Sequence, residues 1–189
     1  MIIGITGTLG AGKGTVTEYL VEEKGFKHFA VSDTFLAGEA IRRGLEPTRV
    51  VRQDIANEFR AQGPTKLMEQ LYAMAVPAID AGDNVVIEPQ HTVAEVNFIT
   101  SIGGSVIAVD ADLELRYGRI QKRGGSKDDV SFEEFKHVED LEMESTDPDK
   151  NNLRASCAAA DFHIDNNGSL EDLHTQIENV LSQIAEKPA

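Results

Sequence analysis

The sequence has a single cysteine, no long apolar run and no signal-peptide pattern, and each of these absences argues against a class of protein. Cys157 is the only cysteine among 189 residues, so no disulfide can form within the chain, which agrees with a reducing compartment. No apolar run approaches the roughly 18 residues of a membrane-spanning helix. The sequence enters an apolar segment directly at Ile2, without the charged region of a signal peptide. We therefore expect a cytoplasmic protein with no membrane partner.

Positive charge is also scarce. The 18 Lys and Arg residues face 32 Asp and Glu residues, which gives a formal net charge of −14. This charge repels a polyanion over most of the surface and argues against a nucleic-acid polymer as partner. A small phosphate would need a local basic cluster. The composition, 41% hydrophobic and 26% charged, is that of an ordinary globular chain, and we expect one domain over residues 1–189.

The segment from Ile2 to Thr15, IIGITGTLGAGKGT, is the most informative part of the sequence. Gly7, Gly12 and Lys13 match the pattern G-x-x-x-x-G-K, which follows an apolar run and precedes a helical pattern, as that motif requires. Glycines allow backbone N–H groups to turn inward around a phosphate, and the lysine adds a mobile cation. The segment therefore predicts a nucleotide phosphate-binding loop.

Strand and helix patterns alternate along the rest of the chain. Apolar runs predict five strands. The first begins at Ile2, and the other four cover residues 29–31, 84–88, 105–109 and 161–165. Spacing and capping residues predict helices at 13–24, 32–43, 48–62, 65–81, 92–102, 110–123 and 131–144 and from 169 onward. This alternation predicts an α/β fold with a parallel sheet covered on both faces. The helices between the second and third strands, and the basic segment after the fourth, are expected to close over a ligand.

Three stretches resemble known kinases. The loop GTLGAGKGT looks like that of adenylate kinase and related nucleoside monophosphate kinases, in which Gly and then Thr follow the lysine. The C-terminal ADFHIDNNGSLEDL resembles the last strand and helix of dephospho-CoA kinase. The middle, from VVIEPQHTVAEVNFI through AVDADLELRYGRIQKRG to SFEEF, is similar to small archaeal and bacterial kinase-like proteins related to both.

The resemblance implies a three-layer P-loop kinase fold with strand order 2-3-1-4-5, an acceptor-binding insertion at about 32–82 and a helical lid at about 119–152. It implies ATP and Mg²⁺ as cofactors. Arg119 and Arg123 match the lid arginines, and Asn166 and Gly168 would lie near the adenine. The residues that would hold the ATP phosphates are Gly7, Gly10, Ala11, Gly12, Lys13, Gly14 and Thr15.

Phosphoryl transfer requires mainly positioning and charge neutralisation, which assigns roles to a few side chains. Lys13 would stabilise the transferring phosphate, and Arg116, Arg119 and Arg123 would do so as the lid closes. Thr15 would contact the metal or the α-phosphate, or serve only as a first-turn threonine. Glu88 ends a buried strand and would bind Mg²⁺ through water or cap the next segment. A solvated helix face paired with Asp and Glu is the alternative for the lid arginines, and it fits Arg116 and Lys122 best.

The expected role of Asp33 depends on whether the acceptor group is a hydroxyl or a phosphate. A carboxylate here would orient a hydroxyl acceptor and take its proton, whereas a phosphate acceptor needs no base. A cap formed by Ser32 or Asp33 at the start of the helix is the structural alternative. Among the five histidines, His91 is a candidate for the acceptor site because it follows the third strand.

Two positions depart from the family pattern. Adenylate kinase and its relatives place an acceptor arginine early in the helix after the second strand, where this chain has Leu36 and Ala37. A second arginine usually follows the third strand, where this chain reads EPQH at 88–91. The candidates to replace them are Arg42, Arg49, Arg52 and Arg60.

These observations predict an ATP-dependent phosphotransferase, monomeric or homodimeric, that acts on a small phosphorylated or nucleotide-like acceptor, a nucleoside monophosphate first. Transfer to a hydroxyl, as in dephospho-CoA kinase, is the second enzymatic reading. A nucleotide-binding regulatory protein without turnover is the alternative from another class, because the usual acceptor arginines are missing.

Overall fold

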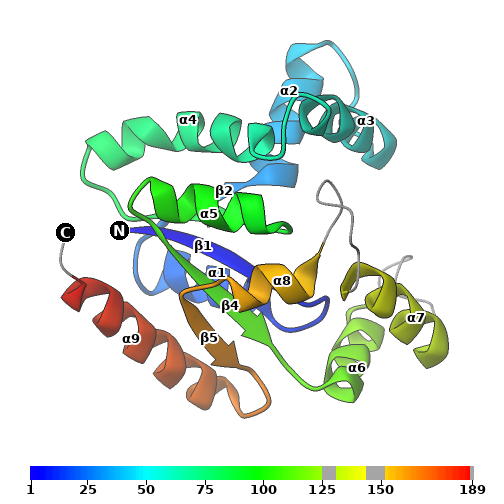
Figure 1. Cartoon of the computed structure of the whole chain (residues 1–189), viewed down its shortest axis with the longest axis vertical. Coiled ribbons are helices and arrows are strands. Elements are labelled where there is room, and N and C mark those ends of the chain that lie inside the picture. Colours follow the sequence, from blue (N-terminus) through cyan, green and yellow to red (C-terminus); the bar gives the residue numbers. More distant parts are fainter. Residues whose placement is uncertain (125–130, 144–151, 188–189) are drawn as a thin grey trace.

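The computed structural model describes residues 1–124, 131–143 and 152–187 and builds them around one parallel sheet (Figure 1). The strands are β1 (Ile2–Gly7), β2 (Lys27–Ala30), β3 (Val85–Glu88), β4 (Ser105–Asp110) and β5 (Phe162–Asp165). Their spatial order is β2-β3-β1-β4-β5, with every neighbouring pair parallel. This confirms the expected order 2-3-1-4-5 and places β1, with the loop that follows it, at the centre.

Alternate residues of the strands pack on opposite faces of the sheet. Ile3 and Ile5 of β1 join the core beneath helices α1 (Lys13–Glu22) and α9 (Leu170–Glu186). Val85 and Ile87 of β3 join the other core, beneath α4 (Lys66–Asp80) and α5 (Val93–Ser101). This two-residue periodicity, with apolar side chains on both faces, is what a sheet covered on both sides requires.

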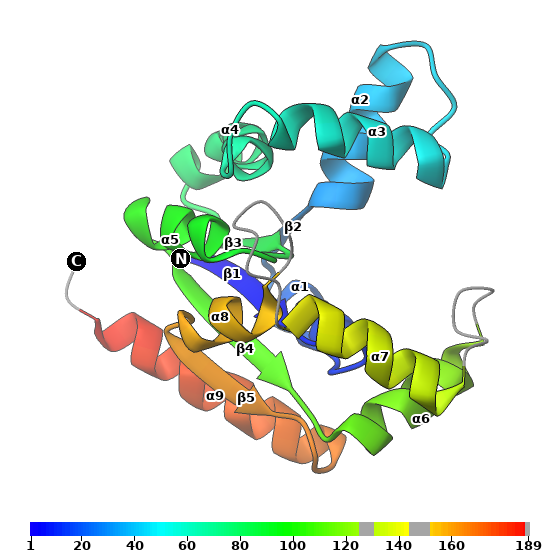
Figure 2. The same ribbon diagram turned by 45° about the vertical axis from the view of Figure 1, so that its right-hand side comes forward.

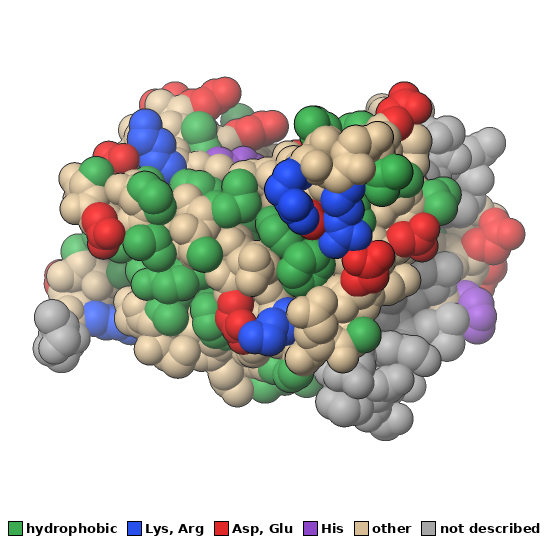
Figure 3. Space-filling view, turned by 90° about the horizontal axis from the view of Figure 1, so that it is seen from above, with side chains coloured by type: hydrophobic (Ala, Val, Ile, Leu, Met, Phe, Trp, Pro, Cys, Tyr) green, Lys and Arg blue, Asp and Glu red, His purple; other side chains and the backbone are tan. Residues whose placement is uncertain are grey.

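The helical insertion between β2 and β3 lies over one end of the sheet. It contains a π-helix, η1 (Val31–Leu36), which continues into α2 (Ala37–Arg42), followed by α3 (Arg49–Arg60) and α4. Figure 3 looks down on this cover and shows Lys and Arg side chains beside Asp and Glu side chains. The ion pairs that Arg42 and Arg43 form with Glu39, and Arg43 with Glu58, belong to this cover.

The segment after β4 forms α6 (Leu113–Arg123), α7 (Phe132–Met143) and α8 (Leu153–Ala158). Figure 2 shows α6 and α7 at the same end of the sheet as α2 and α3, on the opposite side of the strands. The expected lid at 119–152 falls partly on 125–130 and 144–151, which lie outside the described residues. In the described ranges no helix combines the length and the hydrophobicity needed to cross a membrane.

Most element boundaries agree with expectation, and two expected caps are wrong. The capping box of Thr92 and Glu95 is present, and Ser169 and Asp172 form a second one. Neither Ser32 nor Asp33 caps a helix, because η1 already begins at Val31 and the N–H of Ala30 donates to the hydroxyl of Thr34. Asp110 does not open α6 either, because it ends β4.

Candidate functional site

The loop between β1 and α1 has a backbone that requires glycine at three positions. Gly7, Gly10 and Gly12 have φ angles of 142°, 79° and 102°, a region that residues with a side chain rarely enter. A Cβ on Gly7 would lie 2.0 Å from the carbonyl oxygen of Val109. Lys13 follows at the start of α1, and its Nζ donates to the carbonyl oxygens of Gly7 at 2.8 Å and Thr8 at 2.9 Å. The loop therefore folds around its own lysine, as a phosphate cradle does.

The C-terminal turn and α6 both contact this loop. The side-chain amide of Asn166 donates to the carbonyl oxygen of Ala11 at 2.7 Å, and Arg119 donates to the carbonyl oxygen of Asn166 at 2.8 Å. Residues that are about 155 positions apart in the sequence thus meet at the loop. Gly168 lies in the same turn, where a Cβ would come within 2.7 Å of the Asp172 carboxylate.

A cleft of about 560 Å³ opens over the loop. It brings together most of the residues expected to hold a nucleotide, namely Gly10, Gly12, Lys13, Gly14, Thr15, Arg119 and Arg123. Leu9, Glu18 and Ile120 complete its lining. The cations Lys13, Arg119 and Arg123 therefore converge on one space, which suits a polyphosphate despite the acidic charge of the whole chain.

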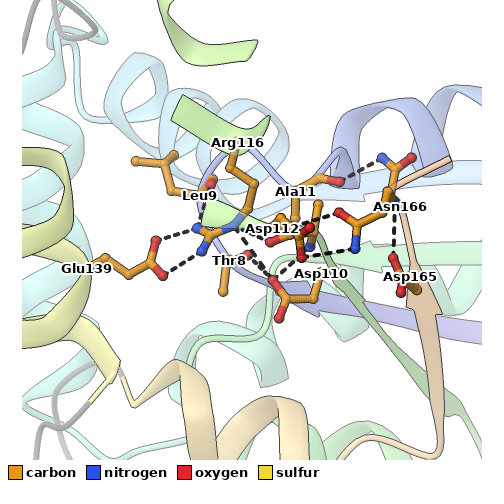
Figure 4. Close-up of polar contacts among 12 residues, drawn as sticks. Thr8, Leu9, Ala11, Asp110, Asp112, Arg116, Glu139, Asp165 and Asn166 are labelled. Atoms are coloured by element: carbon orange, nitrogen blue, oxygen red, sulfur yellow. Dashed lines mark hydrogen bonds and ion pairs between the residues drawn. The ribbon is translucent and has the colours of Figure 1, made fainter. Parts of the chain in front are cut away.

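Arg116 is the residue that sequence reasoning placed wrongly. Its guanidinium is buried, donates to the carbonyl oxygens of Ala111 at 2.7 Å and Leu9 at 3.2 Å, and forms a two-point ion pair with Glu139 of α7 (Figure 4). The predicted pairing with an acid is present, but the predicted solvation is not. Ile120, four residues further on the same helix face and also buried, was the sequence signal for this burial.

Asp110 extends this network to the loop. The hydroxyl of Thr8 donates to the Asp110 carboxylate at 2.6 Å, and the same oxygen lies 3.8 Å from Nε of Arg116 (Figure 4). The loop is thus held by side chains from the end of β4, from α6 and, through Glu139, from α7.

A second cleft, of about 250 Å³, lies between the helical insertion and the end of β3. Arg52, Ala56 and Arg60 follow one another at four-residue intervals on α3, which places both guanidinium groups on one helix face with a small residue between them. The other lining residues are Val31, Ser32, Leu36, Gln53, Leu67, Pro89, His91 and Glu95. The cleft therefore combines an apolar wall with two cations, a carboxyl and an imidazole.

The charged groups of this cleft have different partners. Arg52 donates to the Ser32 hydroxyl and to the Asp33 carboxylate, both at 3.0 Å. Within the described ranges Arg60 makes no hydrogen bond or ion pair, although its charge acts on both Glu95 and His91. Of the four candidate replacements for the missing arginines, two line the cleft. Arg42 is exposed and pairs with Glu39, and the side chain of Arg49 lies outside the described part of the structure.

Two titratable groups follow β3 in this cleft. Oε2 of Glu95 accepts the backbone N–H groups of His91 at 2.7 Å and Thr92 at 3.2 Å, while burial raises the pKa of the carboxyl. Nδ1 of His91 is buried and has no hydrogen-bond partner among the described residues. Burial, followed by the charges of Lys13 and Arg60, lowers the pKa of His91 to about 4, so its imidazole is neutral at pH 7.

Asp33 and Glu88 lie differently from the other candidates. The Asp33 side chain is 83% exposed and pairs with Arg52 at 3.0 Å. Glu88 pairs with Nε2 of His28 at 2.9 Å. Neither residue lines either cleft, and the described residues contain no cluster of three His, Cys, Asp or Glu side chains able to hold a metal ion.

Comparison with known proteins identifies the family. A family model described as "AAA domain" matches residues 3–147. The chain belongs to this family. A UPF0200 protein of Methanosarcina barkeri is 30% identical over 189 residues, which cover 96% of this chain and 94% of that protein.

Solved structures agree on the fold. Shikimate kinase of Aquifex aeolicus superposes with a TM-score of 0.57 at 17% identity over the whole of both chains. Dephospho-CoA kinase of Campylobacter jejuni superposes with a TM-score of 0.58 at 16% identity, over 98% of this chain and 97% of that one. With the strand order, these likenesses show that the chain has the P-loop kinase fold.

Proposed function

We propose that this chain is an ATP-dependent phosphotransferase that transfers the γ-phosphate to a small nucleotide-like acceptor, with a nucleoside monophosphate as the first candidate. The observation that carries the proposal is the presence of two clefts lined by cations, one over the loop and one beneath the helical insertion. Lys13 lines the loop cleft, and its charge acts on His91 of the second cleft. A donor in the first cleft and an acceptor in the second would thus approach one another at the lysine.

The loop cleft provides what a nucleotide donor needs. The loop N–H groups and Lys13 would hold the β- and γ-phosphates, and Arg119 and Arg123 would neutralise charge on the group in transit. Thr15, which lines the loop cleft, would contact Mg²⁺ directly, and Glu88, which lies outside the cleft and pairs with His28, would act only through water; the metal would supply charge neutralisation at the phosphates. Asn166 would stay at the adenine side, where it already holds the loop through Ala11.

In the second cleft, Arg52 would take the place of the acceptor arginines that the sequence lacks. Arg52 and Arg60 supply its positive charge from α3. A monophosphate acceptor needs no general base, and Asp33, which is exposed and engaged by Arg52, contributes a pairing charge rather than a base. This arrangement favours a phosphate over a hydroxyl as the accepting group.

The test is to incubate the protein with ATP and Mg²⁺ and a panel of nucleoside monophosphates, nucleosides and dephospho-CoA, and to measure ADP release and product mass. We expect one or more monophosphates to stimulate ADP release and to yield the diphosphate. Intact ATP binding without stimulation by any acceptor would establish a nucleotide-binding protein without turnover and overturn the proposal.

Lys13→Ala tests the donor side. Loss of one charge-stabilising donor typically costs about 100-fold to 1,000-fold in rate, and we expect a loss of that size. The matched control is Lys24→Ala, which removes a lysine that pairs with Glu178 and lies outside both clefts. Unchanged turnover in Lys13→Ala would remove this lysine from the mechanism.

A further inference from the structure

Two opposite charges in the second cleft have unused hydrogen-bonding capacity. Oε2 of Glu95 already accepts two backbone N–H groups, whereas Oε1 has no hydrogen bond within the described ranges. Arg60, in the same cleft, has no partner within these ranges, and the two side chains form no ion pair with each other there. A carboxylate and a guanidinium that make no ion pair with each other in one cleft can both bind a ligand that presents complementary groups.

The two groups constrain the edge that a ligand presents. A carboxylate oxygen only accepts hydrogen bonds and a guanidinium only donates them. The ligand must therefore offer N–H donors to Glu95 and acceptors to Arg60. The apolar wall formed by Val31, Leu36 and Leu67 suits a flat ring beside these groups.

Nucleobases differ in how well they meet this demand. Guanine carries two adjacent acceptors, O6 and N7, which a guanidinium binds in a two-point contact. Its neighbouring N1–H and N2–H are two donors that one carboxylate oxygen can accept. Adenine places its amino group between two ring nitrogens, so it offers each charged group a single partner and turns a donor toward the guanidinium.

We propose that Glu95 and Arg60 read the base of the acceptor and select a guanine-type nucleoside monophosphate over an adenine-type one. This proposal rests on the proposed function, because it takes the second cleft to be the acceptor site. Glu95 accepts N1–H and N2–H through Oε1, and Arg60 donates to O6 and N7. The reacting phosphate then points from the base toward His91 and Lys13.

The variant Glu95→Gln tests the recognition without removing the helix cap, because Gln also serves at the third position of a capping box. The measurements are the binding constants of GMP and AMP by calorimetry and the ratio of their kcat/KM values. For the native protein we expect a preference for GMP of at least about tenfold, the size of one lost charged contact. In Glu95→Gln we expect that ratio to fall by about tenfold, since an amide can donate to N1 of adenine.

Arg60→Met is the second variant, with Arg42→Met as its control, because Arg42 is exposed and lies outside the cleft. We expect Arg60→Met to raise the KM for GMP about tenfold and Arg42→Met to leave it unchanged. A native preference for AMP, or a GMP-to-AMP ratio unchanged in Glu95→Gln, would overturn the base assignment while leaving the kinase proposal intact. Failure of every monophosphate both to bind and to react would instead defeat the proposed function.

Discussion

Replacement of Arg116 by methionine is the sharpest test of how the loop is held. Methionine keeps the length and the apolar contacts of the side chain and removes its charge and donors. The Glu139 carboxylate, whose side chain is 14% exposed, would lose its ion-pair partner, and the carbonyl oxygens of Ala111 and Leu9 would each lose a donor.

Removing one partner of a buried ion pair costs about 3–5 kcal/mol, because the other charge stays desolvated. For a domain of this size each kcal/mol lowers the melting temperature by about 2–4 °C, so we expect a fall of about 10 °C. Urea unfolding at pH 7 gives the free energy directly. Arg42→Met, which breaks an exposed pair with Glu39, is the control and should cost no more than about 1 kcal/mol.

A double-mutant cycle with Glu139→Met separates the pair from other effects. When both charges are removed, no buried charge is left unpaired, so the double variant should be more stable than the sum of the single losses implies, by at least about 1 kcal/mol. Strict additivity, or a loss below about 1 kcal/mol for Arg116→Met, would show that Arg116 is not the buried anchor described above.

Two further predictions concern the loop and the second cleft. Gly12→Ala forces a side chain into a backbone with φ of 102° and places its Cβ 2.2 Å from the Asn166 amide nitrogen, so the ATP affinity measured by calorimetry should fall at least about tenfold. Gly14→Ala is the control, because its Cβ would meet no atom within 4 Å. It should stabilise α1 by up to about 1 kcal/mol in thermal unfolding. His91 has a pKa of about 4 in the folded protein and about 6.5 in the unfolded chain, so the unfolded state binds more protons between these pH values. The free energy of unfolding should therefore fall by up to about 3 kcal/mol as the pH drops from 6.5 to 4. An equally steep fall in His91→Gln would assign the effect to another group.

Local signals in the sequence predicted most of the fold. The glycine pattern placed the loop after β1, the capping box of Thr92 and Glu95 placed the start of α5, and short apolar runs placed the strands. These features depend on residues close together in the chain. Strand order depends on long-range packing and came from the resemblance to kinases, which the structure confirms.

What the sequence did not predict depends on distant partners. Helix α8 was not expected, because its six residues carry too short a pattern, and the Asn152 cap that opens it donates its own N–H to His91. The ion-pair partner of Arg116 could not be inferred from its neighbours in the sequence, because the acid that balances it comes from α7. The same limit applies to Asp33, whose partner Arg52 lies 19 positions further along the chain.

The departures from the kinase pattern have a common structural reason. Leu36 forms part of the apolar wall of the second cleft. The side chain of Gln90 points into the sheet, where its amide donates to the carbonyl oxygen of Ile87. A Cβ on Gly4 would lie 2.7 Å from Oε1 of Gln90, so this side chain occupies the space that a larger strand residue would fill. Both positions where the family places an acceptor arginine therefore serve packing here. The cations that line the second cleft, Arg52 and Arg60, come from one face of α3, which is a different element from either of those positions.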